Sequence, residues 1–487
     1  MAQGRSIRRF VRGLSMFVAA SMVALISSAL ARAQTYTVLH SFCSAAKCTD
    51  GDSPGGPLLQ ASDGYLYGTT GGEGLNKGGT LFKMSLDGKL TTLYSFCSQP
   101  NCADGDGPDG SLIQATNGYL YGTTYLGGSN NQGTVFSLAP GALTTIHSFC
   151  GQPVCPDGSG PHGALLQATN GNLFGTNGAG GADDWGTVFT LNLDGTLTTL
   201  ADFCRPKCTT GYEPNGTLVQ AANGNMYGTT QSGGSDVFGT VFQITPNGVL
   251  TPVAGFGNPN GPGGSEPSGP LLLASDGNLY GATRLGGVYG LGSIFKMTPG
   301  GTVTTIYSFG SNGNLVETMP YGPLIQATDG NFYGTTSFKD SGTIFKLTPA
   351  GVLTTLHAFC SQANCADGYD PSGGLFQATN GNLYGIANQG GACSSHRCGT
   401  VYRLDVGLGP FVILQTTSGN VGASVKILGT SLTGTSSVTF NGTPAAFTVN
   451  SGGTAISATV PPGATTGTVE VATPNGMLKS NVIYTVE

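Results

Sequence analysis

The sequence is poor in charge and contains a single tryptophan. Charged residues make up 9% of the 487 residues, while glycine alone accounts for 82 of them. Low charge with abundant glycine can accompany disorder, but here the apolar residues recur in short, regular runs. Short apolar runs separated by glycine-rich turns predict many β-strands and therefore an all-β protein.

Recognisable catalytic motifs are also missing. Neither G-x-S-x-G nor H-E-x-x-H nor a P-loop pattern occurs in the sequence. His40, His147 and His357 occupy one position of a repeat described below, where other copies have tyrosine or alanine, and this exchange indicates strand packing rather than catalysis. No pair of carboxylates is singled out as a general acid and base. We therefore expect a protein that is not an enzyme and needs no cofactor.

An export signal is predicted over residues 1–33. Four arginines precede an apolar run at residues 14–30, and Ala31-Arg32-Ala33 matches a small-residue cleavage pattern. An uncleaved membrane anchor is the alternative, but the run is short, interrupted by serines and followed directly by the cleavage pattern. No later stretch is long and apolar enough to cross a bilayer, and the C-terminus has no sorting motif or apolar tail. The mature chain is expected to be secreted and monomeric, in the periplasm or outside the cell.

Loss of the signal segment makes the chain acidic. Residues 1–33 hold five arginines and no acidic residue, so 14 basic and 25 acidic residues remain, a net charge of −11. Nucleic acids and anionic membranes are bound through basic surfaces. The composition therefore argues against a nucleic acid or membrane partner.

A segment of an aromatic residue, glycine and usually threonine recurs seven times. Its glycines are spaced 51–54 residues apart, at Gly68, Gly122, Gly175, Gly228, Gly281, Gly334 and Gly385. In the second copy four strands are predicted, at residues 111–115, 119–124, 133–138 and 143–149, and Asn117-Gly118 is the first hairpin turn. Four strands in about 53 residues are typical of a propeller blade. We predict a seven-bladed β-propeller over residues 34–406, with an open β-solenoid as the alternative.

The N-terminal strand is predicted to close the ring. Residues 35–42 align with the fourth strand of a repeat, such as residues 91–96, whereas the last repeat ends with its third strand at residues 399–404. Pairing between the first and the last of these segments completes the seventh blade and removes exposed strand edges.

Twelve cysteines form six pairs that are close in sequence, and two copies of the repeat lack both members. The pairs are Cys43/Cys48, Cys97/Cys102, Cys150/Cys155, Cys204/Cys208, Cys360/Cys365 and Cys393/Cys398. Joint presence and joint absence predict disulfides, as does the oxidising compartment of an exported chain. Zinc is the alternative, but a structural zinc site needs two such pairs together, and these pairs lie in different blades. We therefore predict six disulfides and no metal site.

Variable loops are predicted to gather on one face of the propeller. Strand direction alternates in a blade, so the loops between second and third strands share a face with the loops that lead to the next blade. Aromatic and charged side chains on these loops are candidates for ligand contact, with packing between loops as the alternative. The candidates are Trp185, Asp183, Asp184, Tyr125, Tyr212, Tyr289, Tyr321, Tyr369, His396 and Arg397. Calcium binding by Asp104, Asp106 and Asp109 is a further alternative, although Asp-Gly is equally good turn chemistry.

The last segment, residues 407–487, differs from the repeats. It contains short β runs but no cysteine and no tryptophan, which predicts an immunoglobulin-like sandwich without the antibody-type core. The segment resembles the IPT/TIG domain, and the matching runs are residues 425–432, 438–443, 456–461 and 467–471. This resemblance implies a spacer or a second binding module.

The repeats resemble the GloVer-type tandem repeat of bacterial exported proteins. The matching residues include Gly133-Thr134-Val135-Phe136 and the runs 143–149 and 163–176, and the resemblance spans residues 36–404. Members often end in a surface anchor, whereas this chain ends in the IPT/TIG-like segment, which weakens the case for covalent anchoring. The family implies no particular chemistry. We predict a secreted, non-catalytic protein that binds carbohydrate or protein with its loop face; the alternative is a secreted polysaccharide lyase or glycoside hydrolase.

Overall fold

The protein is all-β, as its composition predicts. The computed structural model describes residues 34–108, 110–152, 154–204, 209–234, 237–257, 263–310, 318–338, 341–393 and 398–487, so the predicted signal segment at residues 1–33 lies outside the described residues. In these ranges the strands pair into nine sheets. The helical elements there are three short 3-10 turns, η1 (Ala46–Cys48), η2 (Pro100–Cys102) and η3 (Ala363–Cys365).

Seven of the nine sheets come from the repeats, and we number them 1 to 7 in chain order. Sheet 1 contains β2 (Asp52–Gln60), β3 (Leu66–Gly72), β4 (Thr80–Met84) and β5 (Leu90–Ser95). Sheet 2 contains β6 (Ile113–Gln114), β7 (Leu120–Thr124), β8 (Thr134–Ala139) and β9 (Ala142–Ser148). Sheet 3 contains β10 (Ser159–Gln167), β11 (Leu173–Ala179), β12 (Thr187–Leu191) and β13 (Leu197–Asp202).

The later repeats form sheets 4 to 7 in the same way. Sheet 4 contains β14 (Tyr212–Pro214), β15 (Val219–Gln220), β16 (Met226–Ser232), β17 (Thr240–Ile244) and β18 (Leu250–Gly255). Sheet 5 contains β19 (Ser265–Leu273), β20 (Leu279–Leu285), β21 (Ser293–Met297) and β22 (Val303–Ser308). Sheet 6 contains β23 (Ile325–Gln326), β24 (Phe332–Phe338), β25 (Ser341–Leu347) and β26 (Leu353–Ala358). Sheet 7 contains β27 (Leu375–Gln377), β28 (Leu383–Ala387), β29 (Thr400–Asp405) and β1 (Thr35–Ser41).

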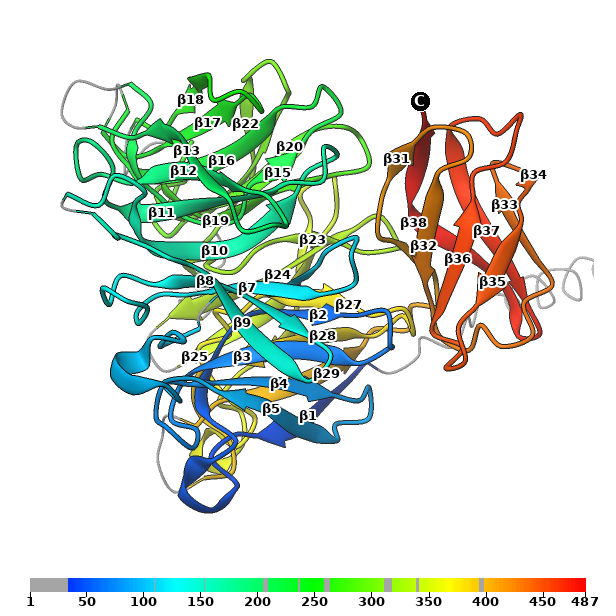
Figure 1. Ribbon diagram of the computed structural model, residues 1–487, viewed down its shortest axis with the longest axis horizontal. Helices are drawn as coiled ribbons and strands as arrows, with labels where there is room; N and C mark the ends of the chain where they lie inside the picture. The colour runs from blue at the N-terminus through cyan, green and yellow to red at the C-terminus, as the bar shows by residue number, and fades with distance from the viewer. Residues whose placement is uncertain are drawn as a thin grey trace, which may run out of the picture.

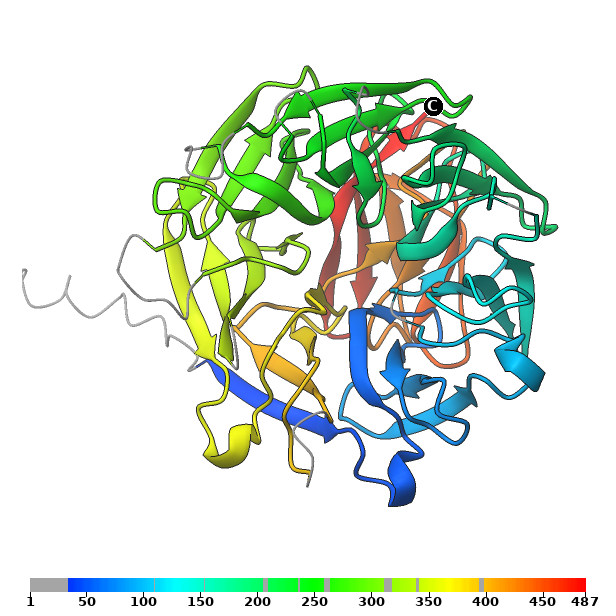
Figure 2. The ribbon, with the colours of Figure 1, turned by 90° about the vertical axis from the view of Figure 1, so that its left-hand side faces the viewer.

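The N-terminal strand completes sheet 7, as predicted. Strand β1 pairs antiparallel with β29, from Thr35 opposite Asp405 to Ser41 opposite Thr400. The seven sheets stand side by side around a ring, in which the blue N-terminal strand lies next to the orange strands of sheet 7 (Figure 2). The chain thereby covers the strand edge that sheet 7 would otherwise expose.

The glycine of the repeated aromatic-glycine segment is required by close packing inside each sheet. Gly122 on β7 lies opposite Phe136 on β8. A Cβ on Gly122 would lie 2.6 Å from Phe136 Cζ and 2.8 Å from Leu112 Cδ2, closer than carbon atoms can approach. The phenylalanine ring therefore occupies the space that any other residue would fill, which explains why glycine recurs here.

Neighbouring sheets are joined by an aromatic pair that repeats at every junction. The phenylalanine that ends the fourth strand of one sheet packs against the aromatic residue in the middle of the third strand of the next, with ring centroids 5.1–5.6 Å apart. The pairs are Phe42–Phe82, Phe96–Phe136, Phe149–Phe189, Phe203–Phe242, Phe256–Phe295, Phe309–Phe345 and Phe359–Tyr402. Such pairs add about 0.5–1.5 kcal/mol each beyond the burial of their area. The first pair joins sheet 7 to sheet 1, so the closing junction is built like the others.

The first strands of the sheets meet at the centre of the ring through glycines. A Cβ on Gly110 would lie 2.6 Å from Gly163 O, and one on Gly163 would lie 2.7 Å from Gly216 C. The same approach closes the ring, because a Cβ on Gly373 would lie 3.1 Å from Gly56 O. Backbone of one sheet therefore meets backbone of the next at these glycines.

A glutamine near the end of the first strand bridges adjacent sheets in six of the seven repeats. Gln114 Oε1 accepts from the Ser62 N–H at 2.9 Å, and Gln60 Oε1 accepts from the Thr379 N–H at 2.9 Å across the closing junction. Equivalent bonds use Gln167, Gln220, Gln326 and Gln377. Sheet 5 has Leu273 at this position instead.

The remaining two sheets form a C-terminal unit, residues 411–486. One contains β30 (Ile413–Leu414), β32 (Ser424–Leu428), β36 (Ala455–Thr459) and β35 (Phe447–Val449). The other contains β31 (Ser418–Gly419), β38 (Gly476–Val486), β37 (Gly467–Thr473), β33 (Ser437–Phe440) and β34 (Thr443–Pro444). The two sheets enclose one hydrophobic cluster that includes Val425, Ile427, Phe440, Val471 and Tyr484.

The C-terminal unit packs against one end of the ring (Figure 1). Thr454 Oγ1 donates to Ser62 O at 2.8 Å, Gln415 Nε2 donates to Gln114 Oε1 at 2.8 Å, and the Thr379 and Thr430 hydroxyls lie 2.6 Å apart. Ser62, Gln114 and Thr379 all lie at or beside the first hairpin turns of sheets 1, 2 and 7. The unit is therefore seated on this part of the ring.

Candidate functional site

The ring has two chemically different edges. In sheet 1, Gln60 pairs with Leu66 and Met84 with Leu90 at one edge, which carries the short hairpin turns. We call this edge of sheets 1–7 the turn face. Asp52 pairs with Gly72 at the opposite edge, where the loops between second and third strands and the loops between sheets lie. We call this edge the loop face; it points away from the C-terminal unit (Figure 1).

Disulfides close the loops of the loop face. Five of the predicted pairs are bonded, namely Cys43–Cys48, Cys97–Cys102, Cys150–Cys155, Cys360–Cys365 and Cys393–Cys398. The sixth predicted pair includes Cys208, which lies outside the described residues. The eight half-cystines of the first four pairs all have positive φ, between 44° and 62°. This conformation is uncommon for residues other than glycine, so cross-links hold the loops in a backbone path that they would otherwise rarely adopt.

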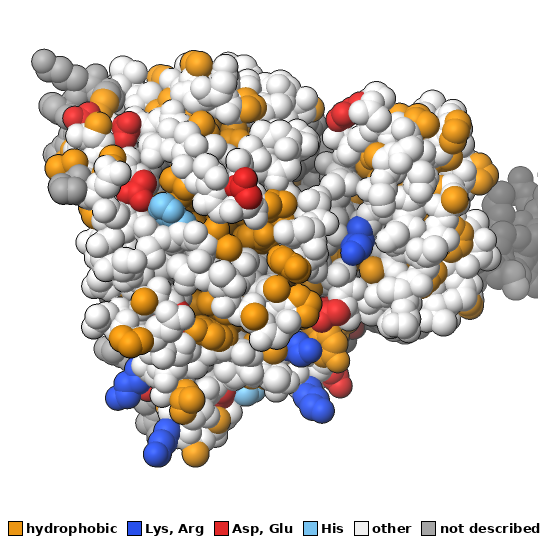
Figure 3. All heavy atoms as spheres, in the orientation of Figure 1, with side chains coloured by type: hydrophobic (Ala, Val, Ile, Leu, Met, Phe, Trp, Pro, Cys, Tyr) orange, Lys and Arg blue, Asp and Glu red, His pale blue; other side chains and the backbone are white. Residues whose placement is uncertain are grey.

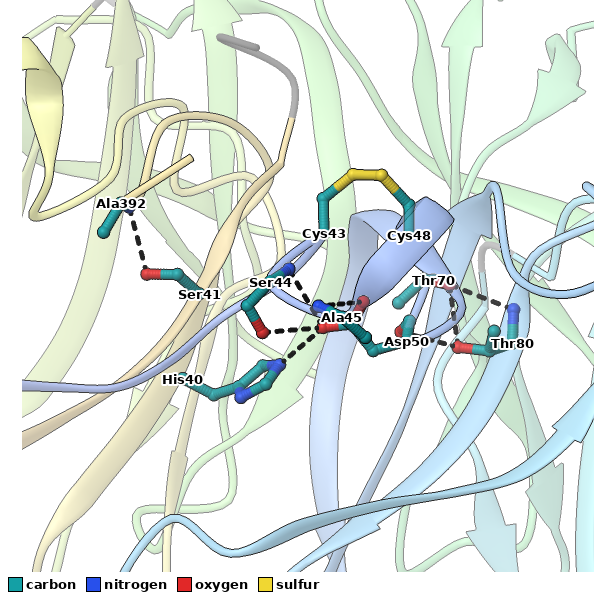
Figure 4. A network of polar contacts seen from close by, with 10 residues as sticks. All are labelled: His40, Ser41, Cys43, Ser44, Ala45, Cys48, Asp50, Thr70, Thr80 and Ala392. Carbon is teal, nitrogen blue, oxygen red and sulfur yellow. Dashed lines mark hydrogen bonds and ion pairs between the residues drawn. A yellow bond between two sulfur atoms is a disulfide. The ribbon is translucent and has the colours of Figure 1, made fainter. Parts of the chain in front are cut away.

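An aspartate organises each of four stapled loops, and three of the four are buried. Asp50 accepts hydrogen bonds from His40 Nε2 and Ser44 Oγ at 3.1 Å and from the Ser44 and Ala45 N–H groups at 3.3 Å (Figure 4). The same arrangement recurs ten residues apart in the pairs Tyr94/Asp104, His147/Asp157 and His357/Asp367. The histidines at this position therefore pair with loop aspartates, a role that the expectation of strand packing alone did not include.

Sequence holds a signal for this arrangement. Each of the four aspartates stands two residues after the second cysteine of its pair and directly before a glycine. Between sheets 3 and 4, Ala201 stands at the histidine position and Thr210 at the aspartate position, so both members of the pair are exchanged together. Paired exchange across a fixed separation indicates contact between the two side chains.

The loop contacts lower the pKa of these carboxyl groups. Burial alone raises the pKa of Asp50, Asp104 and Asp157, but hydrogen bonds from the ring donors and from loop N–H groups outweigh burial, so each pKa lies below its ordinary value. Burial lowers the pKa of the His357 imidazole, and Asp367 opposes this only in part. The aspartates therefore remain ionised as acceptors inside their loops.

Calcium binding by Asp104 would compete with the hydrogen bonds that its carboxylate accepts within the loop. Asp104 Oδ2 accepts from Tyr94 at 2.7 Å, from the Ser98 N–H at 2.9 Å and from Ser98 Oγ at 2.8 Å, while Oδ1 accepts from the Gln99 N–H at 3.1 Å. Asp109 lies outside the described residues. In the part of the chain that the structure describes, no group of three His, Cys, Asp or Glu side chains is placed to hold a metal ion. The Asp104 carboxylate thus has a structural function in its loop.

Two predicted aromatic candidates pack against partners from the next sheet. Trp185 lies in the loop between β11 and β12 and makes an edge contact with Tyr212, with ring centroids 4.9 Å apart. Tyr125 lies beside His162 with centroids 5.1 Å apart, and 45% of Tyr125 remains exposed. Trp185 is partly buried in the cluster between sheets 3 and 4. Tyr125 therefore offers more free ring surface than Trp185.

The other predicted candidates are spread around the loop face. Tyr289 is 53% exposed and Tyr321 is 49% exposed. Asp183 and Asp184 are exposed, and Asp184 Oδ1 accepts from the Gly180 N–H at 3.0 Å. Tyr369, in contrast, is only 8% exposed and packs in the cluster between sheets 6 and 7, which removes it as a residue for ligand contact. His396 and Arg397 lie outside the described residues.

A ring of strained residues begins the first strands on the loop face. One residue before a proline has a φ of 51–63° in every sheet, at Ser53, Gly107, Gly160, Glu213, Glu266, Met319 and Asp370. A residue other than glycine in this conformation costs on the order of 1 kcal/mol or more, and such residues cluster at functional sites. The backbone holds them: the Glu213 N–H donates to Trp185 O at 3.1 Å and the Glu266 N–H donates to Phe238 O at 2.9 Å.

These residues before proline place charged side chains at the inner end of the loop face. Glu266 forms an ion pair with Arg284 on the neighbouring strand, with 3.5 Å between Oε2 and Nη1. Asp370 Oδ1 accepts from Ser337 Oγ at 2.6 Å. Glu213, Asp370 and Arg284 are not among the candidates from sequence. The available signal was the proline that stands 14 residues before each aligned glycine, which marks the same point in all seven copies.

Comparison with known protein families identifies the repeat of this chain. The family model described as the Gloeobacter/Verrucomicrobia repeat matches residues 25–165 and 144–337. The chain belongs to this repeat family. The resemblance seen in the sequence is thereby confirmed for the repeats, and no curated protein matches the chain.

Several solved structures are distantly similar to this member of the repeat family. A fungal alcohol oxidase of the AA5 family in complex with copper is 13% identical, with a TM-score of 0.49 over 89% of this chain and 98% of that one. A structural genomics protein of unknown function from Bacteroides thetaiotaomicron is 14% identical, with a TM-score of 0.39 over 62% and 73%. A luciferin-regenerating enzyme is 11% identical, with a TM-score of 0.38 over 78% and 97%. At this level of similarity none of them assigns a function.

The described residues contain no helix that is long and apolar enough to cross a membrane.

Proposed function

We propose that this protein is an exported, non-catalytic binding protein whose loop face contacts a carbohydrate or a protein. One observation carries the proposal: within the described residues, the hydrogen bonds from the C-terminal unit to the ring all reach the turn face, while the loop face carries side chains that differ between copies. Variable loops on a rigid repeat scaffold are where binding usually occurs.

The proposed scaffold is a seven-bladed β-propeller over residues 34–406. It is supported by seven sheets of antiparallel strands, by an equivalent aromatic pair at each junction and by the pairing of β1 with β29. The proposed second domain, residues 407–487, is immunoglobulin-like and of the IPT/TIG type. It is supported by two sheets around one hydrophobic cluster.

Export is proposed from the signal segment at residues 1–33 together with the disulfides. Five described disulfides suit an oxidising compartment, so the mature chain belongs at the cell surface, in the extracellular medium or in the periplasm. We propose that it acts there as a monomer.

The chemistry of the loop face suits a weakly charged ligand such as a saccharide. Figure 3 shows the ring from the side, with the loop face along its left-hand edge, and few charged side chains appear in this view. Tyr125, Tyr289 and Tyr321 offer exposed rings for stacking, and Glu266 and Asp370 offer acceptors for hydroxyl groups.

Binding should be tested with the chain from residue 34 onward on a glycan array and in a pull-down from the secreted proteins of the source. We expect a ligand that is lost when Tyr125→Ala and Tyr321→Ala are combined on the loop face. Tyr119→Ala, at an exposed tyrosine of the turn face, is the matched control and should leave binding intact. Empty results from both screens would count against a binding function.

A secreted polysaccharide lyase or glycoside hydrolase is the second candidate. Glu213, Glu266 and Asp370 occupy equivalent positions in three sheets, and such enzymes work with paired carboxylates. Turnover of a polysaccharide that is lost in Glu266→Gln or Asp370→Asn but kept in Tyr119→Ala would replace the binding proposal with this one.

A further inference from the structure

A cavity opens at the outer edge of the ring between sheets 2 and 3. Its volume is about 500 Å³, within the range of small-ligand sites. It is lined by the fourth strands of both sheets and the stapled loop between them, chiefly by His147, Gln152, Asp157, Leu197 and Thr199. His147 Nε2 is tied to Asp157 Oδ2 at 2.9 Å, which fixes the imidazole ring as one wall.

At the equivalent place between sheets 6 and 7, an aromatic side chain of the protein fills the space. Leu197 on β13 pairs with Leu191, and Tyr36 on β1 pairs with Leu404, the equivalent residue of sheet 7. Tyr36 and Leu197 are thus the same position of the repeat. The equivalent of His147 is His357, whose Nε2 lies 3.3 Å from Asp367 Oδ2, compared with 2.9 Å between His147 Nε2 and Asp157 Oδ2.

Tyr36 lies flat on the imidazole of His357. The two ring centroids are 3.7 Å apart and the planes differ by 4°. The Tyr36 hydroxyl donates to the backbone oxygen of Asp367 at 2.6 Å. The molecule therefore contains, at one junction, a phenolic ring stacked on the histidine of a stapled loop.

At the junction of sheets 2 and 3, where leucine stands in place of the tyrosine ring, the histidine and its aspartate are more exposed. The side chains of His357 and Asp367 are 14% and 0% exposed, whereas those of His147 and Asp157 are 24% and 20% exposed. The histidine, its aspartate and the disulfide of the loop are present at both junctions, and leucine stands in place of the stacked ring. The cavity beside His147 thus corresponds to the volume that Tyr36 occupies beside His357.

We propose that the cavity between sheets 2 and 3 binds a phenolic ring, stacked on His147 as Tyr36 is stacked on His357. The ring is held mainly by stacking and by contact with Leu197. Its hydroxyl group lies nearer the opening than that of Tyr36, because Asp157 O already accepts from Asn177 Nδ2 at 3.0 Å, whereas the equivalent of Asn177 in sheet 7 is Ala387. The polar groups of the lining, besides His147, come from Ser148, Gln152, Asp157 and Thr199.

The phenolic group has two sources, a free small molecule or a tyrosine side chain on another protein. The site lies on the outermost strands, away from the strained residues at the inner end of the loop face, and its existence does not depend on the function proposed above. Binding of a single small ring is expected to be weak, with a dissociation constant of about 0.1–10 mM.

The test is titration of the chain from residue 34 with 4-methylphenol and with N-acetyl-tyrosinamide, followed by NMR. Leu197→Tyr copies the arrangement at Tyr36 and fills the cavity, so we expect at least a tenfold loss of affinity. Leu250→Tyr is the matched control: it is the same position in sheet 4, at the junction where Ala201 of sheet 3 stands in place of the histidine, and it should leave binding unchanged. Melting curves show whether each variant is folded.

A second variant tests the internal comparison directly. Tyr36→Leu should open an equivalent cavity beside His357 and add one phenol site to those of the native chain. Binding of both probes favours a small-molecule ligand, whereas binding of the tyrosine derivative alone favours a protein partner. Saturation by neither probe in the millimolar range, or unchanged affinity in Leu197→Tyr, would overturn the proposal.

Discussion

The turn face and the loop face are built from the same repeat but held together differently. On the turn face a glutamine side chain of one sheet accepts a hydrogen bond from a backbone N–H of the adjacent sheet, in nearly every copy. On the loop face four stapled loops are organised by a disulfide and an aspartate beside a histidine or tyrosine, and each also accepts a backbone hydrogen bond from the next loop, such as Gly74 N–H to Cys48 O at 3.0 Å. The turn-face bonds between sheets are made by one residue type, while the loop-face pairs use histidine or tyrosine and are replaced by Ala201 and Thr210 at one junction. This difference explains why copy-specific side chains gather on only one face.

All seven junctions between sheets are built alike, including the junction of sheets 7 and 1 that the N-terminal strand closes. Deleting residues 34–43 removes β1, the Phe42–Phe82 pair and the Tyr36 stack. We expect a loss of several kcal/mol and a melting temperature lower by about 10 °C or more, measured by calorimetry against the chain that starts at residue 34. An unchanged melting curve would show that the ring does not depend on this strand.

The interior shared by both faces should be less tolerant than the turn tips. Gly122→Ala places a Cβ against Phe136 and Leu112, so we expect destabilisation of about 2–3 kcal/mol in urea unfolding. Gly118→Ala is the matched control at a hairpin tip, where nothing lies within 4 Å but φ is +86°. The cost there should be about 1 kcal/mol. Equal costs at both positions would contradict the close packing inside the sheet.

The loop face should respond to loss of a single aspartate. Asp104→Ala removes the acceptor of four hydrogen bonds, and we expect destabilisation of about 2 kcal/mol. Thr210 occupies the aspartate position in the fourth copy, so Thr210→Ala is the control and should have a much smaller effect.

Acid should weaken the same loops. The pKa of Asp104 is lower in the folded chain than its ordinary value near 3.9, so its contribution is present above that pH and is lost as the pH falls toward the folded-state pKa. Melting temperature measured from pH 6 to pH 2 should fall less steeply below about pH 4 in Asp104→Ala than in the native chain. Parallel curves would assign the acid sensitivity to other groups.

The turn-face glutamine should make the smallest difference. Gln167→Leu deletes the bond to the Thr116 N–H but copies Leu273, which the protein tolerates in sheet 5. We expect a loss of about 0.5–1 kcal/mol. Leu273→Gln tests the comparison in the opposite direction and should stabilise the junction between sheets 4 and 5 by a similar amount. A larger effect in sheet 3 would mean that the turn face is less uniform than its bonding suggests.

Much of the fold can be predicted from the sequence because the repeat is strictly periodic. Asn117-Gly118 marks a hairpin, the aligned glycines mark the second strands, and the unpaired fourth strand at residues 35–42 points to closure with sheet 7. The candidate site is harder to predict. Exposed Tyr289 and buried Tyr369 look alike in sequence, and their exposure depends on which neighbour packs over them.

The sequence by itself determined the strands, their number per repeat, the paired cysteines and the strand that completes sheet 7. These features are local or recur at a constant spacing, and each copy repeats the same information. Only the tertiary structure decided which face the C-terminal unit covers and that Tyr36 fills a space which Leu197 leaves open. Such contacts form between side chains of different repeats or distant loops, so they exist only once the ring has closed.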